Sequence, residues 1–304
     1  MSVKVDTINF NSLPNCLSMS NGEVELVITT DFGPRILFLG LSGQKKNIFK
    51  IFPEQLQNPV KEAWMSFGGH RLWHAPEVFP RTYYPDNEKV TWNWDGATLV
   101  LTPPAEKTNG IVKTLEIRMA DTGTTVTINH RLSNCGVWPI EISAWCLSVM
   151  APGGKAIVPQ EEFRSHPECL TPARPLVLWH FTTMNDPRFT WGEKYIQLRE
   201  DSTSKTKQKF GIRNSKGWAA YVLGDLVFLK KSPCVENTDY PDMGSSQEFY
   251  TEAGFLEMES LSPLSKLEPG KEISHIEKWA LFTMGGLENE KDFARLDALA
   301  EKYL

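Results

Sequence analysis

Apolar and polar residues alternate with a period of two in many short segments of this chain, and this pattern constrains the fold most strongly. The clearest examples are residues 24–29 and 125–132, in which Val, Leu and Ile recur at alternate positions. Successive side chains of a β-strand point to opposite faces of the sheet. The pattern therefore predicts strands that bury one face and expose the other.

Turn sequences join several of these segments into hairpins. Asp95-Gly96 separates 90–94 from 97–101, Gly224-Asp225 separates 218–223 from 226–230, and Asp121-Thr122-Gly123 links 111–119 to 124–132. Further strands are predicted at 140–149, 194–198, 210–213, 255–261 and 273–283. Repeated hairpins with almost no helix predict an all-β fold, a large antiparallel β-sandwich.

The C-terminal segment has a different periodicity. Between residues 288 and 304, apolar side chains recur at helical spacing and acidic residues cluster at the start, which predicts a helix that packs as a lid on a sheet. No Gly/Ser-rich linker or change of composition divides the chain, so we expect a single domain over residues 1–304.

Composition excludes several classes of protein. A net charge of −5 offers no basic surface for nucleic acid, and no apolar run reaches the length of a membrane span. The first residues are too polar for a signal peptide. The five cysteines include no Cys-x-x-Cys pair, so we expect free thiols and a cytoplasmic location. The oligomeric state is left open.

Residues 67–77 hold two histidines, an arginine, a tryptophan and a glutamate behind the pair Gly68-Gly69. A flat apolar ring beside several hydrogen-bond donors suits a sugar, although a structural loop with a core tryptophan is an equal alternative. In extended conformation His70 and His74 would share one face, which suits the wall of a groove. His-x-x-x-His alone is a weak metal motif and no third ligand lies nearby, so no metal is predicted.

The segment 255–263 is the second candidate for chemistry. As a strand it places Glu257 and Glu259 on one face and Leu256, Met258 and Ser260 on the other. Two neighbouring carboxylates in a groove repel each other, and this raises the pKa of one toward that of a general base. A solvated face, or ion pairs with Arg or Lys, is the alternative.

The order of several short motifs resembles that of the galactose mutarotase-like superfamily, which includes aldose 1-epimerases and hexose-phosphate epimerases. The motifs are Thr30–Gly40 followed by Asn47-Ile48-Phe49, then Gly68–His74, Asn129–Asn134, Phe255–Ser260 and Leu267–Glu272. The resemblance implies a supersandwich fold and a carbohydrate ligand. It also implies an aldose 1-epimerase-like reaction at the anomeric centre that requires no cofactor. In this family a glutamate in the late strand is the general base, which matches Glu257 best and Glu259 second.

One departure from the family concerns the acid. The resemblance implies a histidine on a central strand, but residues 142–148 contain Trp145 and no histidine. We expect His74 of the early segment to supply the acid instead. His70, Arg71, Trp73, Arg81 and Glu259 are expected to orient the sugar. Arg71 and Arg81 could alternatively meet a phosphate, sulfonate or carboxylate on it.

Two other classes of function remain open. One is a non-catalytic carbohydrate-binding module that keeps the groove without the chemistry. The other is a polysaccharide lyase or hydrolase, since a hydrolase needs two carboxyl groups across the scissile bond. Glu77 or Glu162 opposite Glu257 would be that pair.

Overall fold

The computed structural model describes residues 2–59, 62–287 and 293–303. Eleven strands form the first sheet: β1 (Lys4–Phe10), β2 (Leu13–Ser20), β3 (Val24–Ile28), β4 (Ile36–Leu41), β5 (His70–Ala75), β10 (Ile140–Met150), β12 (Leu176–Leu178), β15 (Gln208–Ile212), β18 (Gln247–Glu252), β19 (Phe255–Leu261) and β20 (Ser265–Leu267). Ten form the second: β6 (Thr91–Trp94), β7 (Leu99–Thr102), β8 (Ile111–Met119), β9 (Val126–Asn134), β11 (Lys155–Pro159), β13 (Phe189–Trp191), β14 (Tyr195–Arg199), β16 (Trp218–Leu223), β17 (Leu226–Lys231) and β21 (Glu272–Thr283).

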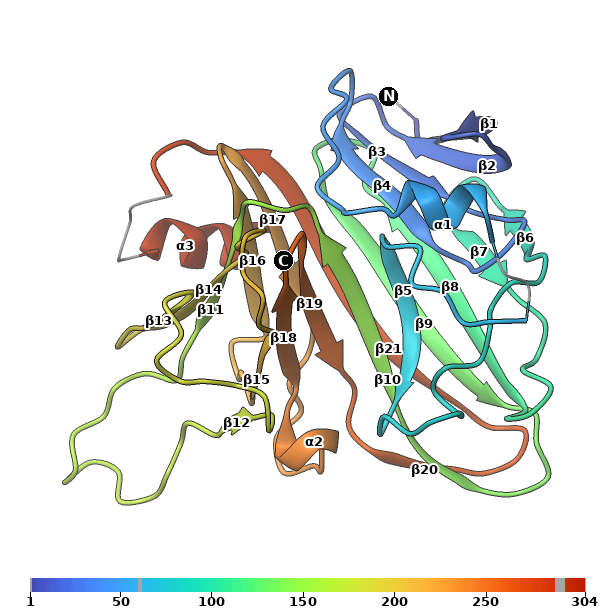
Figure 1. The fold of residues 1–304 in the computed structure, drawn as a ribbon. Coiled ribbons are helices and arrows are strands. Elements are labelled where there is room, and N and C mark those ends of the chain that lie inside the picture. The colour runs from blue at the N-terminus through green and yellow to red at the C-terminus, as the bar shows by residue number, and fades with distance from the viewer. Residues whose placement is uncertain (1, 60–61, 288–292, 304) are drawn as a thin grey trace.

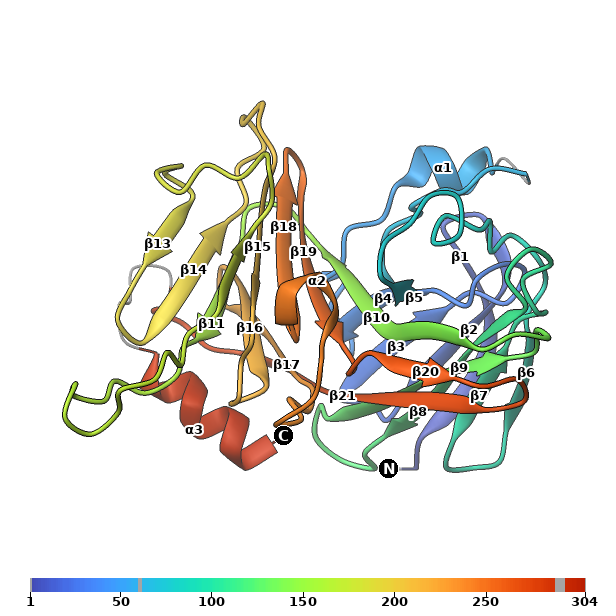
Figure 2. The same ribbon diagram turned by 90° about the horizontal axis from the view of Figure 1, so that it is seen from below.

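The two sheets pack face to face as an antiparallel sandwich, which confirms the predicted fold class (Figures 1 and 2). The first sheet runs in the order β1-β2-β3-β4-β5-β10-β19-β18-β15-β12, and β20 pairs with β10. The second runs β13-β14-β11-β16-β17-β21-β9-β8-β7-β6. The main hydrophobic core lies between them and draws on nearly every strand.

The predicted hairpins form, with small shifts of their ends. The strand after Asp95-Gly96 begins at Leu99, because the Asp95 carboxylate accepts hydrogen bonds from the backbone N–H groups of Ala97 and Thr98 at 2.8 and 2.7 Å. Strand β11 was not predicted. Each of its five residues is buried, so it lacks the alternation of a strand with one wet face.

Helix α3 (Ala294–Tyr303) covers the outer face of the second sheet, as predicted. Phe293, Leu296 and Ala300 pack in one apolar cluster with Tyr195 and Trp218. Residues 288–292 and 304 of the predicted helix lie outside the described residues. The other helices, α1 (Pro53–Gln57) and α2 (Pro241–Gly244), are single turns. None of the helices in the described residues is long and apolar enough to cross a membrane.

A buried ion pair links the two sheets inside the core. Lys230 of β17 lies 2.6 Å from the Glu277 carboxylate of β21, and neither side chain is more than 3% exposed. The Lys230 ammonium also donates to the carbonyl oxygens of Cys146 and Met258 in the first sheet, at 3.3 and 3.2 Å. Burial opposes ionisation of Glu277, but Lys230 outweighs it and keeps the pKa of this carboxyl below its usual value.

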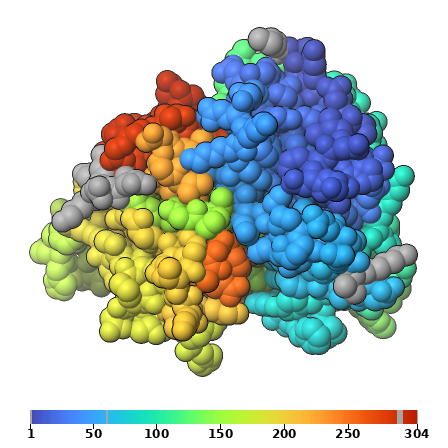
Figure 3. All heavy atoms as spheres, turned by 45° about the horizontal axis from the view of Figure 1, so that its top comes forward, coloured from blue at the N-terminus to red at the C-terminus, as the bar shows by residue number. Residues whose placement is uncertain are grey.

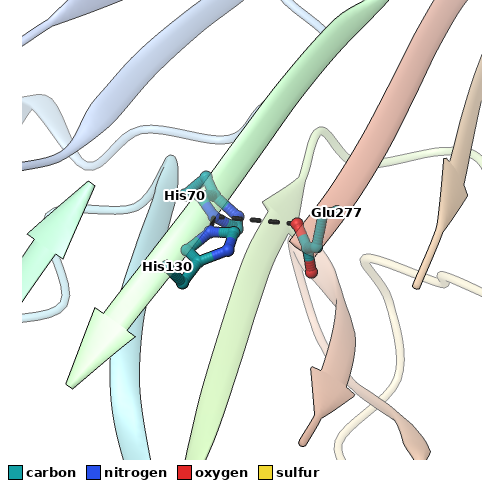
Figure 4. A group of neighbouring side chains, drawn as sticks. All are labelled: His70, His130 and Glu277. Atoms are coloured by element: carbon teal, nitrogen blue, oxygen red, sulfur yellow. Dashed lines mark hydrogen bonds and ion pairs between the residues drawn. The ribbon is translucent and has the colours of Figure 1, made fainter. Parts of the chain in front are cut away.

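Three histidines, His70, His130 and His275, complete this inter-sheet network. Figure 4 shows the first two beside Glu277. The Nδ1 of His130 faces the carbonyl oxygen of His275 at 3.0 Å, so it carries the proton and the Nε2 is an acceptor. The His70 Nε2–H then donates to that Nε2 at 2.8 Å, and His70 Nδ1 accepts from Ser148 at 2.9 Å. Burial lowers the pKa of each of these histidines, so they remain neutral. His130 is therefore a fully hydrogen-bonded histidine of the core.

The same group places potential metal ligands close together. Nitrogen atoms of His70 and His130 and an oxygen of Glu277 lie within 4.8 Å of one another. Lys230 already supplies the positive charge at Glu277, and the facing histidine nitrogens bond each other. We therefore interpret the group as a hydrogen-bonded part of the core.

We expect Lys230→Met to destabilise the fold by roughly 3–5 kcal/mol, because it leaves the Glu277 charge buried without a partner. Urea denaturation of the purified variant measures this loss. The double variant Lys230→Met/Glu277→Gln removes both charges and should recover part of the stability. A single variant as stable as the wild type would show that the ion pair does not hold the sheets together.

Candidate functional site

A cavity of about 570 Å³ lies on the outer face of the first sheet, away from the second sheet. Strands β5, β10, β15, β18 and β19 provide its floor, and segments near α1, 77–83 and 179–181 provide its walls. The face shown in Figure 3 includes the N-terminal half, in blue and cyan, next to the segments in yellow and orange that carry β15, β18 and β19.

Side-chain alternation decides which residues reach this cavity. In β5, Arg71 and Trp73 line it, whereas His70 and His74 face the core. In β19, the two glutamates line it and Met258 packs in the core, as the sequence predicted. Cross-strand pairing places Glu257 beside Tyr250 and Glu259 beside Glu248.

The glycine pair before β5 permits this packing. Gly68 and Gly69 adopt φ values of +79° and +71°, which favour glycine. A Cβ at Gly68 would approach the backbone oxygen of Lys50 to 2.2 Å, and one at Gly69 would approach that of Ile36 to 2.3 Å. The strand that carries Arg71 can therefore enter the sheet only with glycine at both positions.

Aromatic rings make up much of the wall. They are Phe52, Trp64, Trp73, Tyr83, Trp145, Trp179, Phe181, Tyr250 and Phe255. The Arg71 guanidinium stacks on Trp73 at 4.2 Å and lies 5.2 Å from Trp64. The Lys209 ammonium lies 5.0 Å from Trp145 and 4.6 Å from Trp179. These rings hold the two cations of the floor in fixed places.

Lys209 lies between two carboxylates at the floor. Its ammonium is 2.7 Å from Glu248 and 3.0 Å from Glu259. Burial alone would lower the pKa of Lys209, but these carboxylates outweigh it and raise the pKa above its usual value. Burial and the nearby Glu259 raise the pKa of Glu248. Glu259 also accepts a hydrogen bond from Trp145 Nε1 at 2.7 Å, so Lys209 and Trp145 both hold it in place.

Glu257 differs from the other carboxylates of the cavity, since it makes no hydrogen bond with the described residues. Its nearest cation is Arg71, with 3.9 Å between Nη2 and Oε1, and its side chain is 14% exposed. Burial, with a smaller contribution from the neighbouring Glu259 charge, raises the pKa of Glu257 to about 7 against the lowering effect of Arg71. The site thus presents a carboxyl group that titrates near neutral pH.

Three expected site residues lie elsewhere. His70 and His74 do not share the cavity with Glu257 and Arg71, because they occupy the core face of β5. His74 is fully buried, 3.7 Å from Glu106, and so cannot reach a ligand in the cavity as the predicted acid. Arg81 is not among the lining residues and donates instead to the carbonyl oxygen of Pro76 at 2.8 Å.

The structure also identifies site residues that the sequence did not. Lys207 lies in a run of Ser, Thr and Lys that is typical of a loop, and Lys209 directly precedes the predicted strand 210–213, so no pattern marked either residue as part of the cavity. Tyr250 lies on β18, a strand that was not predicted. Trp145 was noted only as the residue in place of a histidine.

A larger hollow, of about 760 Å³, lies along the loop of residues 161–174. It includes Glu162, which therefore does not face Glu257. Glu77, the other partner considered for a hydrolase, does line the cavity of Glu257 and accepts a hydrogen bond from Tyr83. We take the smaller cavity as the candidate site because it joins buried charges to aromatic rings, whereas exposed loop residues line the larger hollow.

Comparison with known proteins supports the fold. No family model matches the chain, and no curated protein matches its sequence. A solved candidate aldose 1-epimerase from Klebsiella pneumoniae matches with a TM-score of 0.60 at 11% identity, over 99% of this chain and 86% of that one. A galactose mutarotase-like protein from Lactobacillus casei matches at 0.54 and 8% identity, over 88% and 100%.

A TPR-domain containing protein from Parabacteroides distasonis matches with a TM-score of 0.61 at 13% identity, over 92% of this chain and 50% of that one. At such low identity these likenesses concern the fold alone. The chain has the galactose mutarotase-like fold, as its sequence motifs implied.

We expect His74→Ala to lower the thermal unfolding midpoint, because His74 packs against Glu106 in the core. If the cavity binds a sugar, as the resemblance in sequence implies, this variant should leave that binding unchanged. Scanning calorimetry measures the midpoint, and tryptophan fluorescence during titration with D-galactose measures binding. Arg71→Met, in the cavity, should weaken binding in the same titration. A loss of affinity in His74→Ala equal to that in Arg71→Met would contradict the assignment of His74 to the core.

Proposed function

We propose that the cavity binds a reducing sugar and that Glu257 transfers protons at its anomeric centre, which makes the protein an aldose 1-epimerase-like isomerase. The observation that carries this proposal is the placement of Glu257, a carboxyl group with a pKa of about 7, on the floor of an aromatic-walled cavity. A general acid or base works best when its pKa lies near the working pH.

The walls suit a sugar ring. Carbohydrates combine apolar C–H faces with many hydroxyl groups, and the lining combines tryptophan faces with carboxylates and cations. Several buried polar atoms of the lining have no hydrogen-bond partner among the described residues: Trp64 Nε1, Trp73 Nε1, Arg71 Nε and Glu259 Oε1. Because buried polar groups are usually hydrogen-bonded, these atoms favour a polar ligand or ordered water beside them.

Glu257 suits the proton transfer better than Glu259. Lys209 and Trp145 both bond Glu259, so taking up a proton there would disrupt an ion pair and a hydrogen bond. Glu257 has one distant cation and no hydrogen bond to a described residue. Two of the solved structures with this fold are described as mutarotase-like or as a candidate aldose 1-epimerase, which agrees with this class of reaction.

We expect Glu257→Gln to reduce the protein-catalysed rate of mutarotation by about a hundredfold to ten-thousandfold, which is the usual cost of losing a general acid or base. The amide keeps the shape of the side chain, so sugar binding should change little. Polarimetry of freshly dissolved α-D-glucose and α-D-galactose measures the rate, and saturation-transfer NMR measures binding.

Glu141→Gln is the matched control, because Glu141 is an exposed residue of β10 that does not line the cavity. It should retain the wild-type rate. Wild-type protein that binds both sugars without accelerating mutarotation would favour a carbohydrate-binding protein over an isomerase.

Glycoside hydrolysis is the second candidate, because Glu77 lines the same cavity as Glu257. A hydrolase places two carboxyl groups across the scissile bond. If this function holds, Glu77→Gln and Glu257→Gln should each abolish release of nitrophenol from nitrophenyl glycosides. If the protein is an isomerase instead, neither the wild type nor either variant should release nitrophenol. Glu77→Gln should then keep most of the wild-type mutarotation rate.

A further inference from the structure

We propose that Glu257 alone performs both proton transfers of mutarotation, acting in its protonated form, with no second side chain as the acid. This inference rests on the proposed function and specifies the mechanism of the same site. Ring opening needs a proton delivered to the ring oxygen and another removed from the anomeric hydroxyl. The described residues of the cavity offer one group suited to both tasks.

Histidine is absent from the described residues that line the cavity. His70 and His74 face the core, separated from the cavity by their own strand. At the central position on β10 lies Trp145, and its single N–H is already donated to Glu259. The groups that usually supply a proton near neutral pH are therefore not available to a ligand here.

The other proton carriers of the lining hold their protons too firmly. Burial lowers the pKa of Arg71 only to about 10. Glu248 and Glu259 outweigh burial and raise the pKa of Lys209. Burial and the Glu77 carboxylate raise the pKa of Tyr83 to about 12, and burial and Glu252 raise that of Tyr250 further. None of these groups gives up a proton readily at neutral pH.

The other carboxylates of the cavity are already engaged. Lys209 and Trp145 bond Glu259, Lys207 and Tyr250 bond Glu252, and Tyr83 bonds Glu77. Glu257 has no hydrogen bond to a described residue, and 3.9 Å separates it from Arg71. Both of its oxygens can therefore bond the ligand at once.

The geometry of a carboxyl group matches that of the anomeric centre. The anomeric hydroxyl oxygen and the ring oxygen are both bonded to C1, as the two oxygens of the carboxyl group are both bonded to Cδ. The protonated oxygen of Glu257 can donate to the ring oxygen while its other oxygen accepts from the anomeric hydroxyl. The two hydrogen bonds close a ring that joins the carboxyl group to the sugar.

The exchange balances without any other reactant. The C1–O5 bond breaks, and its electron pair receives the carboxyl proton at O5. The anomeric O–H bond breaks, its proton moves to the second carboxyl oxygen, and its electron pair forms the C1=O1 double bond. Glu257 ends protonated on the other oxygen, and the open-chain aldehyde rotates about C1–C2. Reversal of the same steps closes the ring on either face.

The ionisation state of Glu257 depends on the titratable groups around it. These groups are Arg71 on β5, Glu259 on β19, Lys209 on β15, Tyr250 and Glu252 on β18, and Lys207 before β15. Burial raises the pKa of Glu257 to about 7, so a large share of the molecules hold the acid form at neutral pH.

The pH dependence of kcat/KM between about pH 5 and pH 9 tests the proposal. If the acid form is active, kcat/KM is constant below a break near pH 7 and falls about tenfold per pH unit above it. Arg71→Gln removes a cation that lowers the pKa of Glu257, so its break should move to higher pH. Difference infrared spectra between wild type and Glu257→Gln should show that the carboxylic-acid band of Glu257 is lost as the pH rises through the same break.

A value of kcat/KM that rises with pH through this range would show that ionised Glu257 acts only as a base. A value that does not change with pH would show that the titration of Glu257 does not limit the reaction. Either result would overturn the single-carboxyl mechanism but would leave the proposed isomerase activity in place. If the wild-type protein accelerates mutarotation no more than Glu257→Gln does at any pH, the proposed function itself is wrong. The two failures are therefore distinguishable from one set of rate profiles.

Discussion

Side-chain alternation along β5, β10 and β19 is the constraint on which the rest of this structure depends. Each of these strands must satisfy two environments at once, since one face lies between the sheets and the other forms the floor of a cavity. In β19, Met258 and Ser260 belong to the core network, and Glu257 and Glu259, at the alternate positions, belong to the site. A register shift of one residue would exchange the two sets.

Two buried clusters of charge lie on opposite faces of these strands, and their balance differs. Between the sheets, one ammonium, Lys230, meets one carboxylate, Glu277, and the neutral histidines add hydrogen bonds. On the cavity side, one ammonium, Lys209, meets two carboxylates, Glu248 and Glu259. The first arrangement favours stability. Beside the second arrangement, burial and the nearby Glu259 charge outweigh the lowering effects of Arg71 and Lys209 and raise the pKa of Glu257 to about 7.

Aromatic residues connect packing to chemistry in the cavity. Trp73 and Trp145 are buried, and their ring centroids lie 5.3 Å apart, so the two rings pack as part of a hydrophobic cluster. Each ring also lies beside a cation of the cavity floor. Such stacking limits the motion of Arg71 and Lys209 and fixes the charges around Glu257 before a ligand arrives. A proton-transfer group benefits from surroundings that need no rearrangement during the reaction.

Local sequence determined many of the strands, the hairpin turns, the C-terminal helix and the common face of Glu257 and Glu259, because periodicity and turn chemistry act over a few residues. It also showed that His70 and His74 would share one face if residues 70–74 are extended, but it assigned that face to the groove and not to the core. Only the tertiary structure decided that Arg71 and Trp73 reach the cavity while His70 and His74 enter the core. That choice depends on Glu277, His130 and Glu106, which lie far away in the chain. The same holds for Lys209, whose role follows from the strands paired beside it and not from its neighbours in sequence.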